Sequence, residues 1–448
     1  MLSGGDNETL TRVGPGTPMG DLMRHYWIPA CLSSELEADD EPMRLLLLGE
    51  RLIAFRDSTG RIGIMDHRCA HRGASLFFGR NEASGLRCVY HGWKYDVEGN
   101  CVDMPNVPPS QDFKRKIKAK AYRVVERAGL VWTYMGPRAE APPLPEIAAL
   151  MLPEAERVLR VHQRECNWLQ SLEGDIDTSH FGFLHIGSVD VNHVDPDTLH
   201  RWAVVDRAPE YKVRETEWGT MYCAFREAEP GALYYRFAHF LLPFFTFSPN
   251  GTFKDLVLCT VNVPMDDEHT MTYSIGWAKR TAPLETLKTG EAIPGLGRDM
   301  KYLPRTNGWY GRWRLEGRRD NDYFIDREAQ RHSSYTGIQG IGRQDQAVVE
   351  SMGTIVDRSL EHLAPSDRMI TATRRRLLKA ARELRDEKKV PATVDGSHIY
   401  RLVRGGSFVA SASLDWLDAY ARNLREATRP LAQDDMQVEP LPQPSGAA

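Results

Sequence analysis

The sequence predicts an α+β fold: a small antiparallel β domain, followed by an α+β domain with an antiparallel sheet and covering helices. Three observations support this prediction. Short apolar runs separated by glycine turns fill residues 40–136. A stretch rich in Pro, Ala and Glu follows at 137–156 and is expected to be a linker. Residues 157–428 mix strand-like runs with amphipathic helical patterns, which leaves 1–39 as an N-terminal segment and 429–448 as a tail.

In the first domain the clearest element is a hairpin at residues 43–55 (MRLLLLGERLIAF), with two apolar runs around Gly49 and Glu50. Further short strands are expected at 61–65, 88–97 and 129–134. Short strands with glycine turns between them are typical of a small antiparallel sheet.

The second domain is expected to contain strands at 234–247, 256–263 and 271–277 and a helix at 167–180. A helix is also predicted at 366–388, because a serine starts it, apolar residues recur at helical spacing and basic residues gather toward its end. Residues 414–428 form a last amphipathic helix. The tail after Arg429 is rich in Pro, Gln and Asp, and it is expected to be extended or disordered.

Composition limits the classes of protein. The chain has 448 residues, 42% of them hydrophobic and 26% charged, which is ordinary for a globular protein. A net charge of −4 gives no electrostatic support for binding nucleic acid. The N-terminus lacks the basic and apolar regions of a signal peptide, and the longest leucine run is far too short to cross a membrane. We therefore expect a cytoplasmic protein without a membrane role.

Two short motifs place two cysteines and two histidines close together: Cys69 with His71, and Cys88 with His91. On neighbouring loops this set suits a Rieske [2Fe–2S] cluster, in which thiolates hold one iron and imidazoles hold the other. Such a centre receives and passes on single electrons. The remaining cysteines are expected to be buried free thiols: Cys31, Cys101, Cys166, Cys223 and Cys259.

A Cys2His2 zinc site is the alternative for these four residues. Zinc sites of this type usually pair like with like, as C-x2–4-C followed by H-x3–5-H. Here each motif carries one cysteine and one histidine. The order of the residues therefore favours the iron–sulfur cluster.

A second group of metal-ligand side chains lies at 166–185 (CNWLQSLEGDIDTSHFGFLH). Asp177 and His180 are three residues apart, so a helix would present both on one face, and Asp177 is expected to orient a histidine. His185 lies about 140° from His180 on an ideal helix. Both imidazoles bind one metal only if the helix bulges or ends near Gly182, and π-bulges gather at functional sites. Glu173 is a weaker candidate for orienting a ligand.

Two histidines need a third ligand. A 2-His-1-carboxylate triad leaves open positions for O2 and is typical of non-haem Fe(II) oxygenases. Residues 337–350 (GIQGIGRQDQAVVE) offer Asp345 and Glu350 in a glycine-rich approach to a helix. Spacing does not choose between the two carboxylates, and a helix N-cap is the structural alternative for Asp345.

The run Glu173-x3-Asp177-x2-His180-x4-His185, together with the cluster motif, resembles the α (catalytic) subunit of the Rieske non-haem iron aromatic-ring-hydroxylating oxygenases. Within that family the chain is similar to the phthalate dioxygenase branch, whose members carry much the same NWLQ-x-LEGDIDTSH-x-GFLH stretch and a Gln-Asp pair near position 345. The resemblance covers residues 10–400, which include both motifs.

This resemblance implies a mononuclear Fe(II) bound by three residues: His180, His185 and Asp345. It implies that Asp177 carries the electron to this iron from a cluster histidine, His71 or His91, of a neighbouring subunit. A homotrimer or homohexamer is expected for that reason. The implied electron donor is an NAD(P)H-dependent reductase with flavin and iron–sulfur centres.

The implied reaction is hydroxylation of a small aromatic substrate with O2, by dioxygenation or by monooxygenation with O-dealkylation. An aromatic carboxylate or an aryl ether is expected, and a carboxylate needs a cation such as Arg201, Arg207 or Arg236. Five phenylalanines are candidates for an apolar pocket, although such residues are more often core: Phe181, Phe183, Phe244, Phe245 and Phe247. Two rival functions remain, an oxygenase for an alicyclic or sterol substrate and a non-catalytic Rieske electron-transfer or metal-binding protein.

Overall fold

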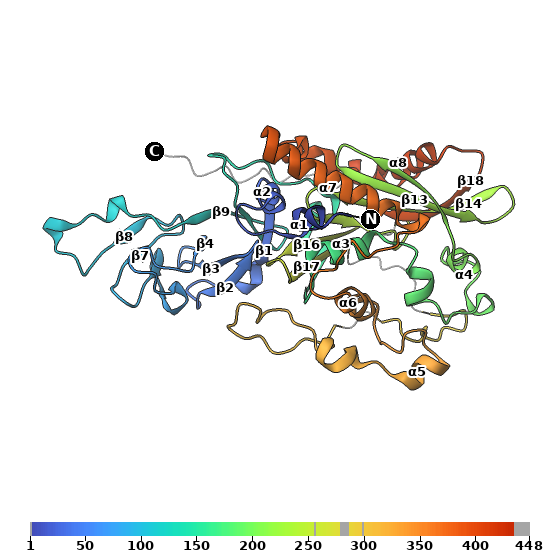
Figure 1. Cartoon of the computed structure of the whole chain (residues 1–448), viewed down its shortest axis with the longest axis horizontal. Coiled ribbons are helices and arrows are strands. Elements are labelled where there is room, and N and C mark those ends of the chain that lie inside the picture. Colours follow the sequence, from blue (N-terminus) through green and yellow to red (C-terminus); the bar gives the residue numbers. More distant parts are fainter. Residues whose placement is uncertain (1, 255–256, 278–285, 298–299, 434–448) are drawn as a thin grey trace.

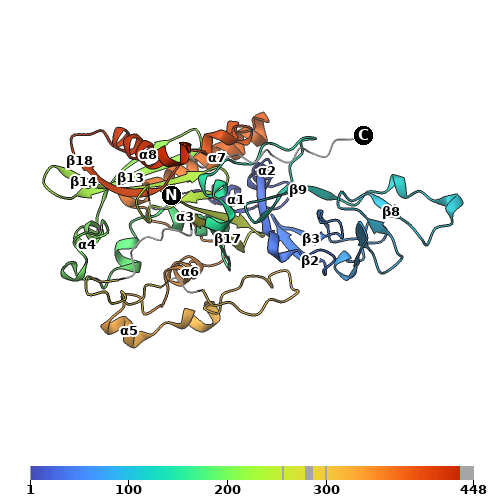
Figure 2. The ribbon, with the colours of Figure 1, turned by 180° about the vertical axis from the view of Figure 1, so that it is seen from behind.

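The computed structural model describes residues 2–254, 257–277, 286–297 and 300–433. The described residues form three antiparallel sheets with helices around the largest one, which confirms the α+β class. The molecule is elongated, with the smallest sheet at one end and the largest sheet in the other half (Figure 1). The view from behind in Figure 2 shows the same division.

The chain begins with two short helices, α1 (Gly4–Thr11) and α2 (Pro18–Arg24), whose first turns are capped by the side chains of Ser3 and Thr17. These helices lie against α7 (Arg368–Glu387), which comes from the far end of the sequence. The N-terminal segment is thus part of the packed structure.

The end of α1 also holds the start of a helix that bears functional residues, α3 (Trp168–Ile176). Trp168 Nε1 donates to the carbonyl of Leu10 (3.2 Å), and Asn167 Nδ2 donates to the carbonyl of Thr11 (2.9 Å). Trp168 and Asn167 are fully buried, so these carbonyls satisfy donors that would otherwise be costly.

Six strands form the first sheet, in the order β1-β10-β9-β4-β3-β2. Their bounds are β1 (Trp27–Leu32), β2 (Met43–Leu47), β3 (Glu50–Arg56), β4 (Ile62–Asp66), β9 (Ala121–Arg127) and β10 (Leu130–Tyr134). The predicted hairpin is β2–β3, with Leu48 and Gly49 at positive φ in its turn. Pairing of β1 with β10 brings residues 27–32, which the sequence prediction left in the N-terminal segment, into this sheet.

Four short strands form the second sheet, in the order β5-β6-β7-β8. Their bounds are β5 (Arg80–Glu82), β6 (Gly85–Arg87), β7 (Lys94–Tyr95) and β8 (Cys101–Asp103). The strand predicted at 88–97 is therefore much shorter than expected. Residues 88–93 turn back instead, because Gly92 takes a φ of 80° and donates its N–H to the carbonyl of Cys88.

The third sheet has the order β11-β17-β16-β15-β14-β13-β12, with β18 paired to β14. Its strands are β11 (Arg157–Arg164), β12 (Glu210–Glu215), β13 (Gly219–Glu227), β14 (Ala232–Leu241), β15 (Phe245–Phe247), β16 (Leu258–Pro264), β17 (Thr270–Trp277) and β18 (Gly406–Ser411). The strand predicted at 234–247 is in fact two strands, β14 and β15, which pair with each other. Pro243 lies between them and has no N–H to continue a ladder.

The remaining helices are α4 (Arg201–Val205), α5 (Arg327–His332), α6 (Ile341–Ser351) and α8 (Trp416–Gln433). Helix α7 confirms the helix predicted at 366–388 and ends where Lys388 takes a φ of 58°. Helix α8 runs past the predicted end at 428, and the rest of the predicted tail, 434–448, lies outside the described residues. Among the described helices, none combines the length and the hydrophobicity that crossing a bilayer requires.

The main core lies between the large sheet and its helices. Helix α3 packs on β15 and β16, and it contributes Leu169, Leu172 and Ile176, all at most 1% exposed. Helix α7 covers β12 and β13 and contributes Leu377 and Ala381. Helix α6 lies next to α3 (Figure 1). Helix α3 is thus held on the large sheet, and α6 is held against α3.

Candidate active site

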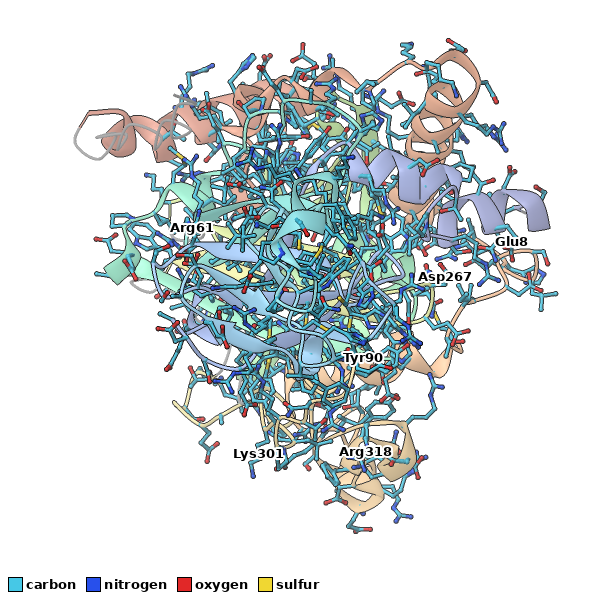
Figure 3. The ribbon with its side chains drawn as sticks, turned by 90° about the vertical axis from the view of Figure 1, so that its left-hand side faces the viewer. Glu8, Arg61, Tyr90, Asp267, Lys301 and Arg318 are labelled. Carbon is cyan, nitrogen blue, oxygen red and sulfur yellow. The ribbon has the colours of Figure 1, made fainter. Side chains whose placement is uncertain are left out.

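The cluster motifs form two similar loops at the end of the molecule that carries the smallest sheet (Figure 1). In each loop a glycine N–H returns to the cysteine carbonyl, from Gly73 to Cys69 (2.9 Å) and from Gly92 to Cys88 (3.0 Å). Both glycines have positive φ (76° and 80°), which a residue with a Cβ rarely adopts. Figure 3 looks onto this end and labels Tyr90, which lies on the second loop.

The loops separate the cysteines from the histidines. Cys69 and Cys88 are 3% and 2% exposed, whereas His71 and His91 are partly exposed, with ring centroids 4.5 Å apart. This arrangement suits a cluster with a buried thiolate-bound iron and an imidazole-bound iron at the surface. Tyr95 Oη lies 3.2 Å from Cys69 Sγ, where its O–H donates to the thiolate.

The side chains of the two loops are not gathered around one point as the ligands of a single zinc ion are. A tetrahedral ion would draw its ligand atoms to within about 4 Å of one another. In the described residues, ligand atoms of three or more His, Cys, Asp or Glu residues come within 4.8 Å of one another only at His180, His185 and Asp345. All seven cysteines are free and buried, as predicted for the five outside the motifs.

The second site begins where α3 ends. The helix stops before residue 177, earlier than predicted, and Asp177 has an extended backbone (φ −91°, ψ 115°). A π-helical turn follows over Phe181–His185, so the bulge expected near Gly182 is present. The wider turn brings the rings of His180 and His185 to 5.1 Å from each other although they are five residues apart.

Helix α6 brings a carboxylate to these imidazoles. Asp345 Oδ1 lies 3.1 Å from His185 Nε2 and 3.6 Å from His180 Nε2. Gly340 is the N-cap of α6, so Asp345 lies inside the helix and is not its cap. Burial raises the pKa of Asp345, but the charges of His185 and His180 and a hydrogen bond from His185 hold it well below the ordinary range. The three side chains therefore present two imidazole nitrogens and an ionised carboxylate to one point.

Gln344 fixes the ring of His185. Its Nε2 donates to three oxygen atoms of the surrounding segments, at 2.8, 3.0 and 3.2 Å, so its Oε1 is the acceptor. His185 Nδ1 lies 2.7 Å from that Oε1 and therefore carries the proton. Nε2, which faces Asp345, is then the ring nitrogen that can bind a metal once its own proton has been displaced. Sequence reasoning missed this role of Gln344.

Asp177 holds His180 in a similar way. Asp177 Oδ2 lies 3.4 Å from His180 Nδ1, and its Oδ1 accepts from the N–H of Ser179 (2.7 Å). Burial raises the pKa of Asp177, but the hydrogen bond and charge of His180 outweigh burial and lower it. Burial lowers the pKa of His180, while Asp177 and Asp345 reverse that shift. An ionised Asp177 thus orients the ring so that Nε2 faces Asp345.

The other two candidate carboxylates have structural partners. Glu350 accepts a hydrogen bond from Tyr323 Oη (2.7 Å) and is fully buried. Glu173 forms buried ion pairs with Arg358 (3.0 Å) and Arg374 (2.6 Å). Glu173 therefore ties α3 to α7 and does not orient a ligand.

The triad borders a cavity of about 360 Å³. Alternate residues of β11 line one wall, because side chains on a strand point to opposite faces in turn: Val158, Arg160, His162 and Arg164. Arg160 is exposed, whereas His162 and Arg164 are each 4% exposed. Further walls come from α3, α6, β16 and β17. These polar wall residues were missed, although Arg160, His162 and Arg164 stand at every second position, a signal that the sequence contains.

One of the three candidate arginines lines this cavity. Arg236 is 1% exposed, its Nε donates to Thr178 Oγ1 (2.7 Å), and its guanidinium lies 4.5 Å from the ring of Phe181. Its other recorded partners are neutral, and no carboxylate of the described residues forms an ion pair with it. A buried cation without a counter-ion is unfavourable, so the site suits an anionic ligand.

The other candidates have different roles. Arg201 pairs with Glu229 on the surface (2.6 Å), and Arg207 donates to the carbonyls of Gly187 and Val189. Of the five phenylalanines, only Phe181 lines the cavity. Three lie in the main core, and one is 43% exposed: Phe244, Phe245 and Phe247, then Phe183.

Residues 26–122 match the Rieske [2Fe-2S] domain, and residues 133–439 match the family described as LigXa C-terminal domain like. The chain is 50% identical to the 3-chlorobenzoate-3,4-dioxygenase oxygenase subunit of Comamonas testosteroni, over 95% of this chain and 99% of that protein. It is 36% identical to the phthalate 4,5-dioxygenase oxygenase subunit of Pseudomonas putida, over 94% and 95% respectively.

Solved structures agree on the fold. The terminal oxygenase of carbazole 1,9a-dioxygenase from Nocardioides aromaticivorans IC177 matches with a TM-score of 0.51 at 19% identity, over 85% of this chain and 98% of that chain. Relatives at 50% and 36% identity span nearly the whole sequence, and the two family matches cover both of its halves. The chain therefore belongs to the Rieske non-haem iron oxygenases, as an oxygenase (α) subunit with a Rieske [2Fe–2S] domain.

Proposed function

We propose that this protein is the terminal oxygenase of a multicomponent system, which uses O2 and electrons from an NAD(P)H-dependent reductase to hydroxylate a small aromatic substrate. The observation that carries the proposal is the triad of His180, His185 and Asp345 in the wall of a cavity of about 360 Å³. Three protein ligands on one side leave coordination positions open on the other. The two relatives that cover almost the whole chain are named as oxygenase subunits of aromatic-acid dioxygenases.

The proposal assigns two metal centres. Fe(II) is bound by His180, His185 and Asp345. The [2Fe–2S] cluster is bound by Cys69, His71, Cys88 and His91. The fit of the first site rests on its donors, since the Nδ1 atoms of both imidazoles face Gln344 and Asp177, which leaves each Nε2 toward an ionised carboxylate, and these are the atoms that bind a metal. Iron in this site supplies the activation of O2.

The substrate class follows from Arg236. Its guanidinium lacks a carboxylate partner among the described residues and borders the cavity beside Phe181. A planar fork of N–H donors suits a carboxylate, and the neighbouring ring suits an aromatic body. We therefore infer an aromatic carboxylate, which Arg236 holds while the rest of the ring extends toward the triad. Dioxygenation and monooxygenation with O-dealkylation both fit this placement.

The assembly and electron path complete the proposal. The cluster loops lie at the end of the molecule away from α3 and α6 (Figure 1). An electron would therefore reach the triad more directly from a neighbouring subunit, and we propose a homotrimer or homohexamer with Asp177 at the crossing point. The electron donor is a reductase with flavin and iron–sulfur centres. The five cysteines outside the cluster motifs are free, which suits the reducing cytoplasm. The proposed division is 40–136 for the cluster domain, to which the pairing of β1 with β10 adds residues 27–32, with 137–156 for the linker and 157–428 for the catalytic domain.

Two measurements test the function. Iron and acid-labile sulfide analysis should give roughly three irons and two sulfides per chain, with the electron paramagnetic resonance signal of a reduced Rieske cluster. Incubation with reductase, NADH, ¹⁸O2 and a panel of benzoates should then give a product with one or two labelled oxygens. Zinc without sulfide, or labelled product from alicyclic compounds alone, would contradict the proposal.

A further inference from the structure

A chain of buried hydrogen bonds lies behind the cavity, and it has no role in the metal binding or substrate binding proposed above. Arg164 on β11 contacts His162 Nε2 (3.3 Å) and donates to Ser171 Oγ (2.8 Å). Ser171 Oγ donates to Asn262 Oδ1 (2.5 Å), and Asn262 Nδ2 donates to Asp175 Oδ2 (2.7 Å). The chain thus runs from the β11 wall to a carboxyl near the end of α3.

Asp175 is the acid at the end of this chain, and it lines the same cavity as the triad. Thr246 Oγ1 donates to Asp175 Oδ2 (2.8 Å), so both recorded hydrogen bonds reach the same carboxyl oxygen. Asp175 remains partly exposed, and no Lys, Arg or His of the described residues lies within ion-pair distance of it. One oxygen is therefore anchored while the other is left without a recorded partner beside the cavity.

The burial of the Asp175 carboxyl favours its neutral form. Burial raises the pKa of Asp175 above the ordinary value, and the charge of Asp345 on α6 adds to this. Arg164 on β11 and the hydrogen bonds from Asn262 and Thr246 act in the opposite direction without reversing the shift. His162 contributes no charge, because burial and Arg164 lower its pKa to about 3. Asp175 is thus an acid that holds a proton more readily than an exposed aspartate.

Oxygenation needs such a proton. Two electrons, two protons and one O2 convert an arene to a dihydrodiol; in hydroxylation they give one hydroxyl group and one water. The electrons come from the reductase, whereas the protons have to enter the cavity. The ligands cannot supply them, since Asp345 is ionised and His185 Nδ1–H is committed to Gln344.

We propose that Asp175 is the proton donor of the cavity: its free oxygen gives a proton to dioxygen as it is reduced, and it is reprotonated by water that enters past the exposed side chain of Arg160. This inference rests on the proposed oxygenase function. The O–H bond of Asp175 breaks, a new O–H bond forms on a dioxygen-derived oxygen, and the carboxylate is held meanwhile by Asn262 and Thr246.

Asp175→Asn removes the acid and keeps an oxygen that accepts from Asn262 and Thr246. In the holoenzyme with its reductase and a benzoate that the wild type oxidises, we expect kcat to fall on the order of 10²–10⁴-fold. The dissociation constant for that benzoate, from quenching of tryptophan fluorescence, should stay within twofold of the wild type. The wild type should lose activity as the pH rises through the pKa of Asp175, and the variant should lack this limb.

Thr246→Val provides a matched test of similar shape. Loss of one hydrogen bond to the ionised form should raise the pKa of Asp175, so the alkaline limb should move up by about one pH unit. This result decides the matter if Asp175→Asn fails to fold. Infrared spectra of the resting protein give a readout without turnover: the carbonyl band of a buried carboxylic acid should be present in the wild type and absent in Asp175→Asn.

The proposal is overturned if Asp175→Asn keeps kcat within threefold together with the alkaline limb, if the wild type has no such limb, or if Thr246→Val leaves the limb in place. A failure of the function itself is distinguishable. In that case the wild type, with full iron and sulfide content, would oxidise no aromatic acid, and neither variant would be needed to show it.

Discussion

The cluster loops take all their proposed ligands from residues 69–91, on two turns that glycines close, and they leave two imidazoles at the surface. The triad instead joins residues 180 and 185, on a π-helical turn, to Asp345 on another helix, in the wall of a cavity. Electrons can be exchanged at an exposed edge, whereas chemistry on O2 benefits from an enclosed space. The two regions differ because one exchanges electrons and the other has to contain a reaction.

The largest effect is expected from variants that remove one metal centre and leave the other in place. Asp345→Ala should lose the mononuclear iron and all oxygenation, while the cluster signal stays, because the two ligand sets share no residue. Iron analysis should fall from about three to about two per chain. Cys88→Ser should do the reverse and lose the cluster. If Asp345→Ala retained the third iron, another residue would have to be the carboxylate ligand, and Glu350 would be the next candidate.

The cavity beside the triad should also bind its substrate through the positive charge of Arg236. Arg236→Met should raise KM for a benzoate roughly 10–100-fold, because a charge-assisted hydrogen bond is lost in a buried place. Steady-state kinetics with the acid and with its neutral amide measure the effect, and the amide should be insensitive. Arg201→Met, on the surface, is the matched control. An equal rise in KM for the acid and the amide would show that Arg236 does not bind the negative charge of the substrate.

A smaller effect is expected from substitution of Gln344, which orients the ring of His185. Gln344→Leu leaves His185 Nδ1–H without its acceptor and frees the ring, so the affinity for Fe(II) should fall about 10–100-fold. Titration of the iron-depleted protein with Fe(II) measures this change. Gln346→Leu on the same helix is the control, since Gln346 contacts Glu350 and no ligand. Equal losses in both variants would indicate damage to α6 instead of a loss of orientation.

The smallest effect concerns the surface-facing centre. Tyr95→Phe removes the hydroxyl 3.2 Å from Cys69 Sγ, so the reduced cluster loses a hydrogen bond. Its reduction potential should fall on the order of 40 mV, which corresponds to about 1 kcal/mol for one electron. Redox titration followed by electron paramagnetic resonance measures the shift. An unchanged potential would mean that the hydroxyl does not reach the sulfur.

Sequence patterns correctly predicted elements that are formed by residues close together in the chain. The hairpin at 43–55, helix α7 and the bulge near Gly182 all follow from residues within a few positions of each other. Patterns predicted less well where chain direction depends on a single residue. Pro243 divides one apolar run into two paired strands. Gly92 turns the chain back inside the strand that was predicted at 88–97.

The triad shows the other limit. Spacing within one segment placed His180 and His185, but nothing local distinguishes Asp345 from Glu350, because both lie on α6. Their surroundings decide: Asp345 faces the imidazoles, and Glu350 faces Tyr323. The role of Gln344 depends on three acceptors that the chain brings from 295–338, which no single-segment pattern contains.

The contact between α1 and the start of α3 has a practical consequence for anyone who produces this protein. Trp168 Nε1 donates to the carbonyl of Leu10, and Asn167 Nδ2 shares its two hydrogens between the carbonyls of Thr11 and Asp267, so removal of residues 1–12 would leave one buried N–H of each side chain unsatisfied at the start of α3. A truncated protein would be expected to purify with depleted iron although every ligand is intact. The cleavage site of an affinity tag should therefore leave residues 1–12 in place.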